Sequence, residues 1–156
     1  MTTGGDAAVQ NFENAIREAF TFLTDEFGFV RVSSTVRTPE HRIFFENATT
    51  RVLVAYELGG IPWVELGKLP APGERGERYD LLFLLMERAP HEIGRITART
   101  REIDQALPTL GYLAGLLREY GADILRGDFA IFPRLRVRAE ENLTRTNEQL
   151  YGKANS

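Results

Sequence analysis

The residues that could do chemistry in this chain are few and lie far apart. It has two histidines, His41 and His91, and no cysteine. Histidine is the usual general base near neutral pH, but neither residue belongs to an HxH or HExxH metal-binding pattern. The lack of thiols excludes cysteine nucleophiles, Cys-ligated zinc and disulfides. We therefore predict no catalytic residue, no metal site and no cofactor.

Patterns for other nucleophiles and for phosphate binding are also missing. Ser33 and Ser34 fall within a predicted strand and lack the GxSxG turn that exposes a catalytic serine. The stretch GERG at 73–76 lacks the Lys-Ser/Thr pair of a phosphate-binding loop and is typical of a charged turn. Together these absences favour a binding function over catalysis.

Arginines cluster near the C-terminal end of the chain. Arg134, Arg136 and Arg138 fall in one predicted helix, where Arg134 and Arg138 share a face because they are four residues apart. The first 27 residues hold five acidic residues and one arginine. Two interpretations stay open: the arginines pair with acids such as Glu140, Glu141 and Glu148 or with the acidic end of the chain, or they form a partner-binding face.

Aromatic residues on the predicted strands offer a second candidate site. Trp63 and Tyr56 flank a Gly-Gly turn. An exposed Trp63 would be a good anchor for a protein partner, whereas a buried one would belong to the core. In an alternative interpretation, His41, Tyr56 and Trp63 line a pocket between the sheet and the C-terminal helices.

The N-terminal segment predicts one helix over residues 7–27, preceded by a disordered stretch at 1–6. Its apolar residues recur at helical spacing and form a single stripe. These are Phe12, Ile16, Phe20, Leu23 and Phe27. Gly28 follows as the expected C-cap.

Residues 29–69 predict a three- to four-stranded antiparallel meander, because short β-rich runs alternate with turn residues. A hairpin is expected around residues 47–50. In residues 51–58, Val52, Val54 and Tyr56 share one face, and Leu53 and Ala55 share the other. Because both faces are apolar, this strand is expected to be covered on both sides.

The remainder predicts three to four helices. Asp80 is placed to cap a helix over 81–88, the pattern of residues 91–100 is ambiguous and compatible with an ordered loop, and Pro108 predicts a kink or a new helix. Asp128 is a candidate cap for the last helix. The buried side of that helix is expected to carry Phe132, Leu135, Ala139, Leu143 and Leu150. The prediction is therefore a single α+β domain spanning residues 1–156.

Composition places the chain among soluble proteins. The net charge of −3 and the lack of surface aromatics between the arginines argue against nucleic-acid binding. No signal peptide is evident and the longest apolar run is far too short to span a membrane. We expect a cytoplasmic protein without membrane contact.

Three stretches carry a resemblance: AFTFLTDEFGF, RVLVAYELGGIPWVELGKL and REYGADILRGDFAIFPRLRVR. Together they resemble a broad set of small uncharacterised bacterial α+β proteins, some of which are similar to immunity proteins of polymorphic toxin systems. This resemblance implies a protein that occludes a toxin, and it brings no catalytic residues with it. The leading expectation is a non-enzymatic protein-binding module, and the alternative is a small enzyme or small-molecule sensor. A homo-oligomer joined through an edge strand is compatible with both.

Overall fold

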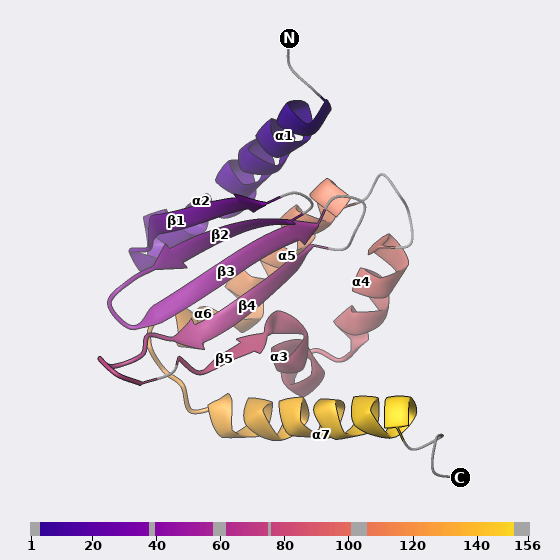
Figure 1. Cartoon of the computed structure of the whole chain (residues 1–156). Helices are drawn as coiled ribbons and strands as arrows, with labels where there is room; N and C mark the ends of the chain where they lie inside the picture. The colour runs from indigo at the N-terminus through magenta and orange to yellow at the C-terminus, as the bar shows by residue number, and fades with distance from the viewer. Residues whose placement is uncertain (1–3, 38–39, 58–61, 75, 101–105, 152–156) are drawn as a thin grey trace.

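The computed structural model describes residues 4–37, 40–57, 62–74, 76–100 and 106–151 (Figure 1). Two helices, α1 (Gly4–Ala19) and α2 (Thr21–Phe27), precede the strands. The strands are β1 (Val30–Arg37), β2 (Glu40–Glu46), β3 (Thr50–Glu57), β4 (Trp63–Lys68) and β5 (Arg78–Asp80). The later helices are α3 (Leu81–Arg88), α4 (His91–Thr100), α5 (Ala106–Tyr120), α6 (Ala122–Leu125) and α7 (Phe132–Tyr151). The α+β class and the order of elements are confirmed.

The N-terminal helix differs from the prediction at its start and in its continuity. It begins at Gly4, so residues 4–6 are helical, and residues 1–3 lie outside the described part. It breaks at Phe20, whose backbone leaves the helical region before α2 starts. The predicted stripe is nevertheless correct for four residues. Phe12, Ile16, Phe20 and Leu23 are buried, and Phe27 is partly buried. Gly28 ends α2 in the left-handed conformation, with φ of +69°.

The sheet is an antiparallel meander in the order β1-β2-β3-β4-β5, which is one strand more than the three to four predicted. The missed strand is β5, whose three residues pair with Glu65–Gly67. A β-bulge interrupts the pairing of β1 with β2 between Arg31 and Ser33. In the β2–β3 hairpin, the Asn47 amide fixes both the turn and its neighbours. Its Oδ1 accepts from the Thr49 and Thr50 amides, and its Nδ2 donates to the carbonyls of Phe27 and Leu125.

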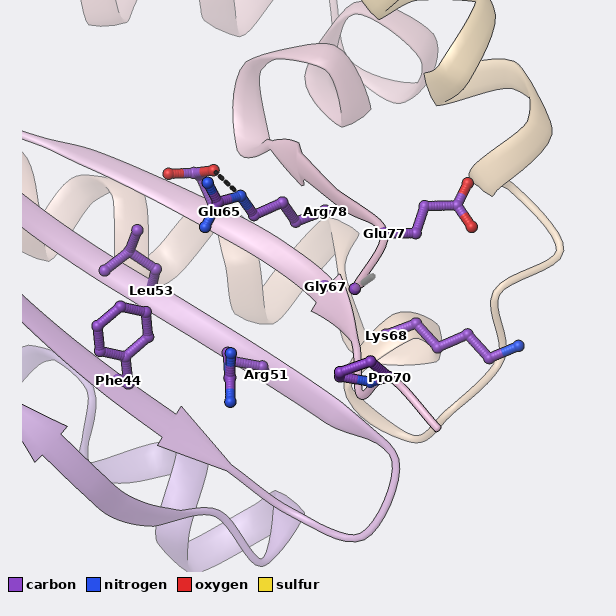
Figure 2. A pocket seen from close by; sticks show the side chains of 10 residues that line it. Phe44, Arg51, Leu53, Glu65, Gly67, Lys68, Pro70, Glu77 and Arg78 are labelled. Carbon is purple, nitrogen blue, oxygen red and sulfur yellow. Dashed lines mark ion pairs between the residues drawn. The ribbon is translucent and has the colours of Figure 1, made fainter. Parts of the chain in front are cut away.

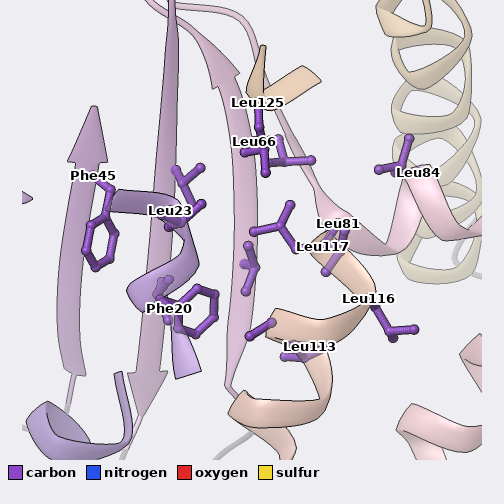
Figure 3. Packing of buried hydrophobic residues seen from close by; sticks show 14 of the residues in the cluster. Phe20, Leu23, Phe45, Leu66, Leu81, Leu84, Leu113, Leu116, Leu117 and Leu125 are labelled. Atoms are coloured by element: carbon purple, nitrogen blue, oxygen red, sulfur yellow. The ribbon is translucent and has the colours of Figure 1, made fainter. Parts of the chain in front are cut away.

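Helices cover only one face of this sheet in the described residues. In Figure 1, α1, α2, α5 and α6 lie behind the strands, and α3, α4 and α7 lie beside the β5 edge. Figure 3 shows the resulting core, in which Phe20 and Leu23 meet the inner face near Leu66, Leu113 and Leu117. The prediction that β3 is covered on both sides is therefore wrong.

The C-terminal helices confirm some sequence expectations and correct others. Asp80 caps α3 by accepting a hydrogen bond from the Leu82 amide at 2.9 Å, and α5 has Pro108 in its first turn. Residues 91–100, whose sequence pattern is ambiguous, form α4 and not an ordered loop. Asp128 accepts from the Ala130 amide and so stabilises the turn before α7 rather than the helix itself. No helix in the described residues is long and apolar enough to cross a bilayer.

The last helix is only half packed. Phe132 and Leu135 are buried as predicted, and Ala139 is partly buried, but Leu143 is 61% exposed. Leu150 lies outside the residues whose side chains are described. The predicted apolar stripe thus continues beyond the point where α7 leaves the core.

Candidate functional site

The open face of the sheet is the most distinctive surface of the described residues. Strand register sorts its side chains into rows that run across the strands, because paired residues in an antiparallel sheet point to the same side. One row holds Arg42, Ala55 and Trp63. The next holds Phe44, Leu53, Glu65 and Asp80, and a third holds Glu46, Arg51, Gly67 and Arg78.

Two apolar residues in the middle of this face are buried without a covering layer. Ala55 is 0% exposed and Leu53 is 3% exposed. Ala55 lies between Arg42 and Trp63 in its row, and Leu53 lies between Phe44 and Glu65. Long side chains from neighbouring strands therefore shield them, which explains how β3 is apolar on both faces in a sheet with helices on one side.

A groove of about 270 Å³ opens on this face next to the β4–β5 turn. Figure 2 shows Phe44, Leu53 and Gly67 as its floor, with Arg51 and Arg78 on either side. Gly67 has no side chain to fill the floor, and an added Cβ would be crowded at 3.2 Å from both the Cβ of Arg78 and the carbonyl oxygen of Glu77. The groove thus places an apolar floor between two guanidinium groups.

The charges around the groove are only partly neutralised. Arg51 donates through Nε and Nη2 to Glu46 Oε2 and lies over the Phe44 ring, with 5.6 Å from Cζ to the ring centroid. Arg78 makes one ion pair with the described residues, from Nε to Glu65 Oε1 at 3.4 Å, and its side chain is 62% exposed. Glu65 also accepts a hydrogen bond from Trp63 Nε1 at 3.1 Å. Guanidinium hydrogens of Arg78 therefore remain available to a partner.

The arginines of α7 are paired, though not with the acids considered from the sequence. Arg136 contacts Glu77 at 2.6 Å, and Arg138 contacts Glu87 at 2.7 Å. Arg134 approaches the same Glu87 at 3.9 Å. The first and last helices do not pack together, because α1 and α7 lie at opposite sides of the molecule (Figure 1). These arginines tie α7 to α3 and to the start of β5, and a role in partner binding stays a prediction.

The residues of the alternative pocket are not brought together. His41 and Tyr56 face each other across β2 and β3 on the inner face, where both contact Phe12. Trp63 lies on the open face, in the row of Ala55. His41 is 1% exposed, and neither ring nitrogen has a hydrogen-bond partner among the described residues. The structure therefore gives His41 a place in the core and separates it from Trp63.

A second hollow, of about 370 Å³, does lie between the sheet and the C-terminal helices. Its walls are Pro62, Val64, Leu81, Leu82, Ile96 and Leu113, with Trp63 and Asp80 at its border. Burial raises the pKa of the Asp80 carboxyl to about 6, and the nearby Glu65 adds to the rise. This hollow lies where the alternative pocket was predicted, between the sheet and the C-terminal helices. Of the three residues predicted to line that pocket, only Trp63 lines the hollow.

No other chemical centre emerges from the part of the chain that the structure describes. It contains no group of three or more His, Cys, Asp or Glu side chains that could hold a metal ion. No protein-family model, curated protein or solved structure matches the chain. The open face of the sheet with its groove and the hollow beside α3 are therefore the two candidate sites of the described residues. Sequence reasoning singled out neither Phe44 nor Arg51 and Arg78. The alternation of side chains along β3 puts Arg51 on the same face as Leu53, and the register of the β2–β3 hairpin puts Phe44 opposite Leu53. Arg78 lies on β5, the strand that the sequence did not predict.

Proposed function

We propose that the protein is a non-enzymatic, cytoplasmic binding module that contacts another protein through the open face of its sheet. The observation that supports this proposal is the composition of that face. Aromatic and arginine side chains surround two buried apolar residues, Leu53 and Ala55. Trp and Arg are the side chains most enriched at the energetic centres of protein interfaces. Such centres combine an apolar floor with a polar rim, as Phe44 and Leu53 do with Arg51 and Arg78.

The groove also favours a particular chemistry in the partner. An apolar side chain can lie on Phe44 and Leu53, while carboxylates accept hydrogen bonds from Arg51 and Arg78. An acidic surface with a protruding apolar residue is therefore the complement we expect. A toxin occluded by an immunity-type protein is the partner class that agrees with the resemblance in the sequence.

Site-specific photo-crosslinking tests the location of the contact. A photoreactive phenylalanine analogue replaces Phe44 in one variant and the exposed Leu143 of α7 in a matched control. We expect one protein to be captured from position 44 and not from position 143, and the purified pair to form a stoichiometric complex. Capture from position 143 alone, or no complex from the purified pair, would contradict the proposal.

Co-expression tests the immunity function separately. If the captured protein is toxic, cells that make it should survive only when the wild-type chain is present. The variant with Arg51→Glu and Arg78→Glu should fail to protect, provided that circular dichroism shows it to be folded. Protection by this variant equal to that of the wild type would place the contact elsewhere, for instance on the arginines of α7.

A further inference from the structure

The hollow beside α3 exists because β5 is short. β5 pairs only with Glu65–Gly67, and the chain then turns into α3 at Leu81. Val64, earlier in β4, therefore has no strand neighbour on that side. Helices α3, α4 and α5 supply the missing wall through Leu82, Ile96 and Leu113. The result is an apolar space of about 370 Å³ at the edge of the sheet, within the range of small-molecule sites.

One ionisable group borders this apolar space. Asp80 Oδ1 accepts from the Leu82 amide at 2.9 Å, and no described residue hydrogen-bonds to Oδ2. Asp80 also forms no ion pair with any described lysine or arginine, and Arg78 is paired instead with Glu65. A carboxylate with one oxygen unused at the mouth of an apolar pocket is suited to a ligand that brings a hydrogen-bond donor with a positive charge.

We propose that this hollow binds a small organic cation, in which an ammonium group contacts Asp80 and an apolar body lies against Val64, Ile96 and Leu113. An anionic ligand would meet the carboxylates of Asp80 and Glu65 together. A purely apolar ligand would cover Asp80 without giving Oδ2 a partner, which is unfavourable. The hollow adjoins the open face of the sheet at Trp63 and Asp80 but shares no lining residue with the groove, so ligand binding there does not depend on the proposed protein contact at the groove.

Calorimetric titration of the whole chain at pH 7.5 tests this inference with three matched probes: phenethylamine, 2-phenylethanol and 3-phenylpropionate. They share the aromatic body and differ mainly in the polar end group. We expect saturable binding of phenethylamine that is at least about tenfold tighter than binding of the alcohol or the acid, as a charge-assisted hydrogen bond predicts. Absence of saturable phenethylamine binding, or equal binding of 3-phenylpropionate, would overturn the proposal.

Two variants and one control locate the binding. Asp80→Asn keeps an N-cap side chain but removes the charge, and it should weaken phenethylamine binding about tenfold or more. Leu82→Arg, a change at a partly buried position, should weaken it as well by placing a competing cation beside Asp80. Asp128→Asn, at an exposed position in the turn before α7 and away from the hollow, should leave it unchanged.

The same titration at pH 5 gives an independent readout. Asp80 is then mostly protonated, since its pKa is about 6, while phenethylamine stays cationic. We expect about tenfold weaker binding at pH 5 than at pH 7.5 for the wild type and no such change for Asp80→Asn. Binding to Asp80→Asn as tight as to the wild type, or a pH dependence that survives in this variant, would show that Asp80 does not receive the ligand.

Discussion

Replacement of Asp80 by Asn should stabilise the protein at neutral pH and remove part of its pH dependence. The folded-state pKa of about 6 lies about two units above the ordinary value of 3.8, and each unit corresponds to about 1.4 kcal/mol. Keeping Asp80 ionised in the folded protein at pH 7 therefore costs about 3 kcal/mol. An Asn side chain can accept the same hydrogen bond from Leu82 but loses the attraction of a carboxylate to the helix N-terminus. We expect a net gain of about 2 kcal/mol.

The direction of the pH effect follows from the raised pKa. The folded protein holds the Asp80 proton more tightly than the unfolded chain does, so this group's contribution is fully present below about pH 4 and is lost as the pH rises through about 6. Between pH 7 and pH 5 the wild type should gain about 1 kcal/mol from Asp80, and Asp80→Asn should gain none from this position.

Urea unfolding at pH 5 and pH 7, followed by far-ultraviolet circular dichroism, measures both quantities. Asp128→Asn serves as the control, because it removes an exposed carboxylate that also accepts from a backbone amide, and it should keep the pH dependence of the wild type. If Asp80→Asn is less stable than the wild type at pH 7 and retains the same difference between the two pH values, the reasoning about the buried cap is wrong.

Three further substitutions test other parts of the fold, each through the free energy of unfolding in urea. His41→Leu should stabilise the protein by about 1 kcal/mol, because it removes two buried ring nitrogens that have no hydrogen-bond partner in the described part of the chain; a loss of stability would show that the imidazole makes a hydrogen bond. Asn47→Ala should lower the free energy of unfolding by about 3 kcal/mol, since five hydrogen bonds of its side chain are lost, whereas Asn142→Ala on exposed α7 should be nearly neutral. Gly127→Ala should lower the free energy of unfolding by about 2 kcal/mol or more, because φ of Gly127 is +93° and the new Cβ would lie 2.8 Å from Thr49 Oγ1. An unchanged midpoint of urea unfolding would contradict this packing.

The sequence predicted the elements that have strong periodicity. The stripe from Phe12 to Leu23 is buried because a helix places residues three and four apart on the same side. The cap at Asp80 and the end of α2 at Gly28 were also predictable, since both depend on residue type at one position. Strand β5 was missed because three residues carry no alternation that could distinguish a strand from a loop.

The two wrong predictions about burial, for β3 and for the end of α7, share a physical cause. The apolar character of a residue does not determine which part of the protein covers it. Leu53 and Ala55 suggested a second layer, yet neighbouring side chains such as Phe44 and Trp63 shield them instead. Leu143 continues the helical period of α7, but the helix has already passed the edge of the core.

Neither surface used for the functional argument could be located from the sequence. The groove depends on the register that sets Arg51 and Arg78 on either side of Gly67. The hollow depends on where β5 ends relative to β4. Both are consequences of pairing between distant segments, which local patterns do not encode.

The affinity between the chain and the partner captured at position 44 is the most direct test of the central claim. The dissociation constant should be measured for the wild type, for Arg51→Glu with Arg78→Glu, and for Arg145→Glu on the exposed half of α7 as the matched control. We predict that charge reversal at the groove weakens binding at least about tenfold, in line with charged contacts at interface centres, and that Arg145→Glu leaves it within about twofold. Equal affinities for the wild type and the groove variant, with both proteins folded, would contradict the assignment of the open sheet face as the binding surface.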